Sequence, residues 1–176
     1  AFARACIPQG DLARDKALLF LFELHRERGR MKEATGALQE LDRLADPAGA
    51  VRMVMADAWA RLGDKTRSAA TLENLKDARG TRSSTPDLEM KLAFLYSEIG
   101  EEEKAQTLWL DLWGRIDSIP RRRYVEDRLM TVAARRGTLA KIAVEIEGKL
   151  LDKTANDRDA GLLVQIYSRV NDPVSA

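Results

Sequence analysis

The chain has 176 residues, of which 45% are hydrophobic and 32% are charged, and its formal net charge is +1 at pH 7. This balance leaves enough apolar surface for a packed core and excludes a disordered chain. The near-neutral charge disfavours nucleic acid as a partner, because domains that bind it usually carry a basic surface. No stretch approaches the roughly 20 apolar residues that a membrane-spanning helix needs, so we expect no membrane insertion.

The residues that carry most enzyme and metal chemistry are scarce in this sequence. His25 is the single histidine and Cys6 the single cysteine, which leaves no Cys/His zinc set and no evident acyl-transfer triad. The acidic run Glu101–Glu103 is interpreted as a solvated first turn of a helix, where carboxylates favour the helix dipole. The basic run Arg121–Arg123 is interpreted as solvated surface, because consecutive helical residues point about 100° apart. We expect no catalytic, metal-binding or cofactor-binding site.

Hydrophobic residues recur at helical spacing along the chain and predict an all-α protein. Helices are expected over residues 11–28, 31–45, 48–62, 65–78, 86–99, 101–117, 120–136, 138–151 and 157–170. Thr85, Pro86 and Asp87 form a typical helix start, with a capping side chain, a proline in the first turn and an acid near the positive end of the dipole. Residues 79–85 have the composition of a loop.

Turn residues divide these helices into pairs. Gly29, Gly63, Gly100 and Gly137 each follow one apolar helix and precede another, and Asn171 holds the equivalent last place, at intervals of 34 or 37 residues. A period in this range is typical of a solenoid of helical hairpins. Four residues before each turn residue stand His25, Trp59, Tyr96, Ala133 and Tyr167. We expect these side chains to pack between helices, His25 at least half-buried, and Trp113 to be partly exposed.

The best-conforming hairpins resemble the tetratricopeptide repeat (TPR), a 34-residue unit with a large residue, a small residue, an aromatic, a turn glycine and an alanine at fixed offsets. The matching residues are Leu92, Ala93, Tyr96, Gly100 and Ala105 in one hairpin, and Met55, Ala56, Trp59 and Gly63 in another. The other repeats depart from the pattern, because Phe22, Met130 and Val164 replace the small residue. The resemblance implies a right-handed α-α solenoid of about four and a half antiparallel helical hairpins.

The repeats are expected to occupy residues 11–47, 48–85, 86–119, 120–154 and 155–176. Residues 1–10 are interpreted as the severed end of a preceding helix or tail, since the chain opens on Ala1 rather than methionine. Each repeat would contact only its neighbours in such an array.

The resemblance also implies a function and a surface. In TPR proteins the first helix of each hairpin lines a concave face that binds a partner peptide or protein. The corresponding positions here are Met53, Asp57, Arg61, Asp87, Met90, Phe94, Glu98, Tyr124, Asp127, Thr131 and Arg135. The terminal repeats add Lys16, Leu19, Glu23, Arg26, Glu27, Arg158, Gln165 and Arg169. We therefore expect a non-catalytic protein-protein interaction scaffold.

Two alternatives remain open from the sequence. The chain fits a structural segment of a longer periplasmic or envelope-associated helical array, whose surfaces are covered by flanking repeats. It also fits the non-catalytic helical part of an enzyme. A cytoplasmic and a periplasmic location are both compatible with a single cysteine.

Overall fold

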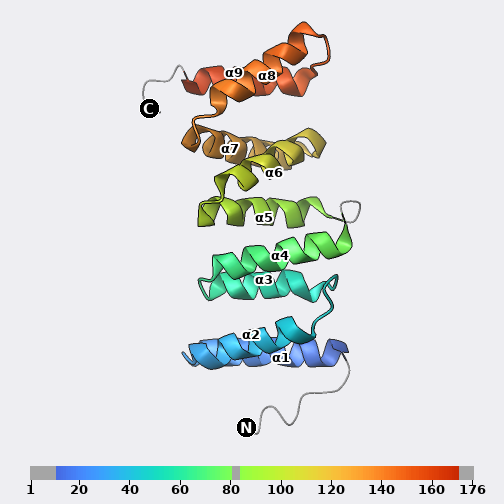
Figure 1. Cartoon of the computed structure of the whole chain (residues 1–176), viewed down its shortest axis with the longest axis vertical. Helices are drawn as coiled ribbons and strands as arrows, with labels where there is room; N and C mark the ends of the chain where they lie inside the picture. The colour runs from blue at the N-terminus through green and yellow to red at the C-terminus, as the bar shows by residue number, and fades with distance from the viewer. Residues whose placement is uncertain (1–10, 81–83, 171–176) are drawn as a thin grey trace. The chain divides into compact units, whose positions relative to one another are not determined.

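The computed structural model of the chain describes residues 11–80 and 84–170. Within them the chain is all-helical, with nine α-helices and no strand (Figure 1). The helices are α1 (Asp11–Glu27), α2 (Met31–Leu44), α3 (Val51–Arg61), α4 (Lys65–Arg79), α5 (Pro86–Ile99), α6 (Glu102–Arg115), α7 (Ile119–Arg135), α8 (Leu139–Leu151) and α9 (Asp157–Val170). The predicted all-α class is confirmed. None of the described helices is long and apolar enough to span a bilayer.

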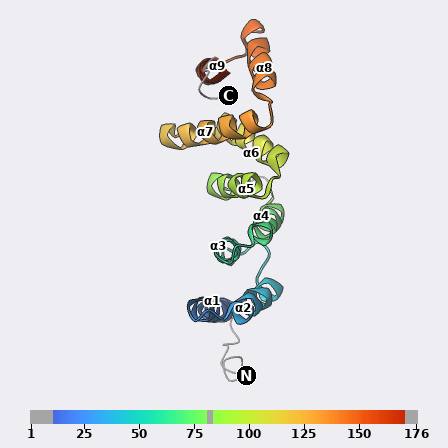
Figure 2. The same cartoon turned by 90° about the vertical axis from the view of Figure 1, so that its left-hand side faces the viewer.

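The chain divides into two compact units, the first ending at Ile99 and the second beginning at Gly100. The first unit contains α1 to α5, with α1, α3 and α5 on one side and α2 and α4 on the other (Figure 2). In the second unit α7 and α9 lie on one side and α6 and α8 on the other. Each unit thus has the alternation of first and second helices that stacked hairpins require.

The four predicted turn glycines adopt left-handed backbone conformations. Their φ values are +69° at Gly29, +83° at Gly63, +83° at Gly100 and +65° at Gly137. At Gly63 the reversal lets the Asp64 N–H donate to the Trp59 carbonyl at 3.0 Å. The Asp64 carboxylate then accepts from the Arg67 N–H at 2.9 Å and caps α4. One turn therefore ends a helix and begins its partner.

Two predicted helix starts have different outcomes. The start of α5 at Pro86 is confirmed, and the Leu88 N–H donates to the Thr85 hydroxyl at 3.4 Å. The start of α3 at residue 48 is wrong, because α3 begins at Val51. Asp46 holds the preceding residues in a turn: its carboxylate accepts from the Ala48 N–H and its carbonyl from the Gly49 N–H, both at 3.0 Å.

Some predictions fall on residues outside the described ranges. They are the severed end at 1–10, residues 81–83 of the predicted loop, and the turn at Asn171.

The core of the first unit forms where α1, α2 and α3 meet. Phe22 is 1% exposed and packs with Leu38 and Trp59. Phe22 occupies the position that a small residue holds in the TPR pattern, so the departure noted in the sequence adds apolar volume to the core. His25 is half-buried as expected. Full burial of a large apolar side chain contributes roughly 1.5–3 kcal/mol relative to its exposed state.

The second unit corrects two predictions about aromatic residues. Trp113, expected to be partly exposed, is 7% exposed, and its indole N–H donates to Glu126 at 3.2 Å. Tyr167, expected to be packed, is 43% exposed, and its hydroxyl donates to Glu147, which raises the pKa of Tyr167.

Two reciprocal hydrogen bonds at the start of α9 fix the rotation of this helix about its axis, which explains why Tyr167 faces outward. The Asn156 N–H donates to the Asp159 carboxylate at 2.9 Å, and the Asp159 N–H donates to the Asn156 side chain at 3.1 Å. Asp159 is thereby held at 3% exposure. Leu162 and Ile166 follow it on the same face of the helix and fill the core, so Tyr167 turns toward solvent.

We predict opposite effects of alanine at two glycines. Gly63→Ala should lower the free energy of unfolding by about 1–2 kcal/mol, because a Cβ strains a left-handed residue. Gly36→Ala, inside α2, should raise it by about 0.5–1 kcal/mol. Apart from the adjoining backbone, an added Cβ meets no atom within 4 Å at either site, so clashes with the surrounding structure do not contribute. Urea denaturation followed by circular dichroism measures both changes, and equal signs would contradict this account.

Candidate partner-binding site

Two predicted partner-binding charges of the first unit, Arg61 and Asp57, form ion pairs with residues of neighbouring first helices. Arg61 of α3 pairs with Glu23 of α1 at 2.5 Å, and Asp57 of α3 pairs with Lys91 of α5. Each pair joins the first helix of one hairpin to the first helix of the next. Exposed ion pairs contribute about 0–1 kcal/mol each, but a partner that used these charges would have to separate them.

The other predicted residues of the first unit offer mainly apolar surface. Glu98 pairs with Lys65 at 2.6 Å, and Asp87 is exposed in the first turn of α5. Met53 and Met90 are half-buried. Phe94 is 36% exposed, which makes it the largest apolar contact that the predicted residues of this unit present.

In the second unit, three of the four predicted residues on α7 interact locally. The Tyr124 ring lies edge-on to Trp109, with ring centroids 6.0 Å apart. The Thr131 hydroxyl donates to the Asp127 carbonyl of its own helix at 2.8 Å. Arg135 lies 3.9 Å from Glu102 of α6. The side chain of the fourth residue, Asp127, lines a cleft instead.

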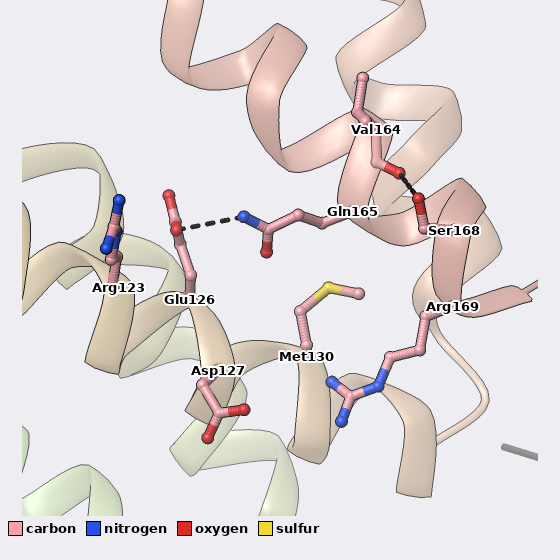
Figure 3. A pocket seen from close by; sticks show the side chains of 8 residues that line it. All are labelled: Arg123, Glu126, Asp127, Met130, Val164, Gln165, Ser168 and Arg169. Atoms are coloured by element: carbon pink, nitrogen blue, oxygen red, sulfur yellow. Dashed lines mark hydrogen bonds between the residues drawn. The ribbon is translucent and has the colours of Figure 1, made fainter.

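This cleft lies between α7 and α9 and has a volume of about 540 Å3 (Figure 3). It is lined by Arg123, Glu126, Asp127, Met130, Val164, Gln165, Ser168 and Arg169. Three of these residues, Asp127, Gln165 and Arg169, are positions that the resemblance placed on the binding face. Met130 is 3% exposed and forms part of the wall on α7, while Val164 is 66% exposed on α9. The lining combines an apolar patch with charges of both signs.

Glu126 connects the cleft to the interior of the second unit. One carboxylate oxygen accepts from the Trp113 indole of α6 at 3.2 Å, and the other accepts from the Gln165 amide of α9 at 3.4 Å. Figure 3 shows Glu126 and Gln165 facing each other across the cleft. A second hollow of about 400 Å3, which reaches Arg122 and Arg158, shares these two residues. The contact between Glu126 and Gln165 therefore separates two adjoining hollows.

Three charged side chains of the cleft are not neutralised within the described part of the chain. No hydrogen bond or ion pair there engages the guanidinium groups of Arg123 and Arg169 or the carboxylate of Asp127. The contrast with the first unit is clear, because Arg61 and Asp57 both have partners. The lining carries two positive charges, on Arg123 and Arg169, and two negative charges, on Glu126 and Asp127, so its formal charges balance.

The sequence contains a feature that predicts a buried polar contact at Glu126, although the TPR pattern does not include it. Arg52, Glu89 and Glu126 each stand eleven residues before a turn glycine, where the first repeat has the buried Leu18. Arg52 and Glu89 are 7% and 4% exposed. A charged residue that recurs at an offset facing the core indicates a buried polar contact. Arg123 and Ser168 carry no comparable signal, because each is an ordinary surface residue by sequence.

The described residues contain no group of three His, Cys, Asp or Glu side chains that could hold a metal ion. The cleft also lacks histidine and cysteine. Its lining offers charged groups, hydrogen-bonding groups and apolar surface.

No protein-family model matches the sequence, and no curated protein is similar enough in sequence to count as a relative. Solved structures do resemble the fold. The TPR-like repeats of a candidate kinesin light chain from Podosopora anserina match with a TM-score of 0.53 and 15% identity, over 88% of this chain and 86% of that one. A variant of that protein matches with a TM-score of 0.54 and 15% identity, over 88% and 85%. The likeness shows a TPR-like helical-repeat fold.

We predict that Glu126→Ala destabilises the protein by about 1–3 kcal/mol, because the Trp113 N–H is left buried without its acceptor. Glu126→Gln retains an acceptor oxygen and should recover most of the loss. Urea denaturation of the two variants measures the difference. Equal stability of both variants would mean that the Trp113 hydrogen bond makes no net contribution.

Proposed function

We propose that this chain is a non-catalytic protein-protein interaction scaffold, and that it binds a segment of a partner protein on the first-helix faces of its TPR-like repeats. The fold supports this proposal, since helical repeats hold side chains of successive hairpins on fixed surfaces. The observation that carries it is the cleft between α7 and α9, where an apolar patch adjoins charges that have no partner within the described residues.

The chemistry of the cleft suits a peptide segment better than a small ligand. It is open, and six of its eight lining residues are polar or charged, whereas small-molecule pockets are predominantly apolar and enclosed. A peptide segment can place one apolar side chain against Met130 and Val164 while its polar groups meet the surrounding charges. Recognition of this kind needs no catalytic group.

The two units would contribute differently to partner binding. We propose that Asp127, together with Gln165 and Arg169, makes the polar contacts in the second unit. In the first unit we assign the contacts mainly to Met53, Met90 and Phe94. The rim of the proposed face would be formed by its remaining residues, which are Asp57, Arg61, Asp87, Glu98, Tyr124, Thr131 and Arg135.

A second candidate function is a structural segment of a longer helical array. It is favoured by α9, where Leu163, Tyr167 and Val170 share one face and Tyr167 and Val170 are 43% and 59% exposed. In this reading a flanking helix covers that face. Amide hydrogen exchange of α9 should then be slower in the full-length gene product than in residues 1–176 alone, and identical exchange would contradict the array.

We predict that filling the cleft abolishes partner binding. Ser168→Trp places a bulky ring in the cleft, and it should not unfold the helix because Ser168 is exposed and bonds only the carbonyl of its own helix at 2.9 Å. The immobilised chain should enrich binders from a displayed library of random peptides, and the Ser168→Trp variant should lose them.

Ala160→Trp provides the matched control. Ala160 is exposed on the same helix but does not line the cleft, so this variant should bind the selected peptides as the wild type does. Absence of any enriched peptide, or equal binding by the Ser168→Trp variant, would refute the cleft as the binding site. Loss of binding in the Ala160→Trp variant alone would indicate that the peptides bind the face of α9 that carries Tyr167 instead of the cleft.

A further inference from the structure

The outward face of α8 differs in composition from the outward faces of the other second helices. In α2, α4, α6 and α8 the residues 3, 7, 11 and 14 positions after the turn glycine are exposed or half-buried. On α2, α4 and α6 these positions include charged side chains such as Glu40, Asp77 and Asp111. On α8 they form an uncharged row, the outer stripe, which consists of Ala140, Val144, Gly148 and Leu151.

The outer stripe faces away from the core of the second unit. Ile142, Ala143 and Ile146 are the buried residues of α8, and the stripe lies on the opposite side of the helix because successive residues are about 100° apart. Val144 is 65% exposed and Leu151 is 83% exposed. An apolar row at positions where the other repeats carry charges indicates a surface that another molecule covers.

Two charged residues on one flank of the stripe indicate what covers it. Lys141 and Glu145 are exposed one helical turn apart, and no hydrogen bond or ion pair engages either side chain within residues 11–80 and 84–170. The other charges of α8 nearby have partners, since Lys149 lies 3.5 Å from Asp159 and Glu147 accepts from the Tyr167 hydroxyl. One cation beside one anion is complementary to an inverted copy of the same flank.

We propose that the outer stripe is a contact between two copies of this chain, in which two α8 helices pack antiparallel about a two-fold axis at Val144. Such a contact is isologous, so each residue of one copy meets a defined residue of the other. Val144 meets Val144 of the second copy. Ala140 meets Gly148 of the second copy, and these small residues let the two helices approach closely.

The same arrangement satisfies the charges on the flank. A two-fold axis between antiparallel helices places the same flank of both copies side by side. Lys141 stands three residues before the axis and Glu145 one residue after it, so Glu145 and the Lys141 of the second copy differ by only about 3 Å along the helix. Symmetry forms this ion pair twice. A parallel arrangement would instead place lysine beside lysine and glutamate beside glutamate.

The contact would be weak and would leave the peptide site accessible. One pair of helices of this length covers less surface than the roughly 1,200 Å2 of stable interfaces, so we expect dimers only at high concentration. In the second unit α8 lies on the side of α6, whereas α7 and α9 lie on the other side (Figure 2). A dimer through α8 would therefore present two α7/α9 clefts, which favours partners with two binding segments. The dimer itself does not depend on the proposed peptide binding.

Sedimentation equilibrium of the whole chain tests the dimer, over about 10 to 500 μM because a small interface dissociates readily. Val144→Glu should raise the dimer Kd about tenfold or more, since it places two carboxylates together at the axis. Val54→Glu is the matched control. Val54 is 48% exposed on α3, so this variant adds the same charge away from the contact and should keep the Kd within about twofold. Circular dichroism should show equal helix content in both variants.

Charge reversal tests the antiparallel register. Lys141→Glu and Glu145→Lys should each raise the dimer Kd about fivefold or more, because each places like charges together twice. An equimolar mixture of the two variants should form a heterodimer with a Kd near that of the wild type. In the mixture every acid of one copy faces a lysine of the other.

Each result decides the proposal. A chain that stays monomeric over this range, or a Val144→Glu variant that dimerises as the wild type does, would overturn the α8 contact. A mixture that associates no more tightly than the two separate variants would overturn the antiparallel arrangement.

Discussion

The hairpins depend on a backbone reversal that glycine adopts without strain. A left-handed residue ends the first helix, and the next residues begin the second helix within one turn, as at Gly63 and Asp64. Because the reversal is so short, large side chains near the end of the first helix lie against the start of its partner. Trp59 and Phe22 fill the resulting space in the first unit. The placement of the surface side chains on α1, α3 and α5, including the proposed partner-binding positions, follows from this packing.

Charge pairing distinguishes the first-helix face of the first unit from the α7/α9 cleft of the second. On the first unit, Glu23, Asp57, Arg61 and Lys91 satisfy one another across neighbouring first helices. Such pairs add little stability. They raise the free-energy cost of binding for any ligand that has to separate them. In the α7/α9 cleft the corresponding cost is absent, because Arg123, Asp127 and Arg169 are not engaged with each other or with other described residues. A scaffold built from similar repeats can thus concentrate recognition in one place without changing its fold.

The sequence predicted the helices and turns closely because both depend on local residues. Turn glycines and cap residues set helix ends, so Gly63, Gly137 and Thr85 were informative by themselves. The rotation of α9 depended on the cap between Asn156 and Asp159, and a repeat register alone did not predict it. The cleft was only partly predictable for a related reason. Whether a charged residue is paired depends on distances between helices, which single-sequence patterns do not contain.

The joint between α2 and α3 has a consequence for how the first unit unfolds. The Arg52 guanidinium, 7% exposed, donates to the carbonyls of Asp42 and Ala45 at 3.0 Å and to the Asp42 carboxylate. It therefore ties the last turn of one hairpin to the first turn of the next. Opening the hairpin of α1 and α2 alone would break these hydrogen bonds of Arg52. The two hairpins are consequently coupled in unfolding, so partly open forms that separate them should be sparsely populated.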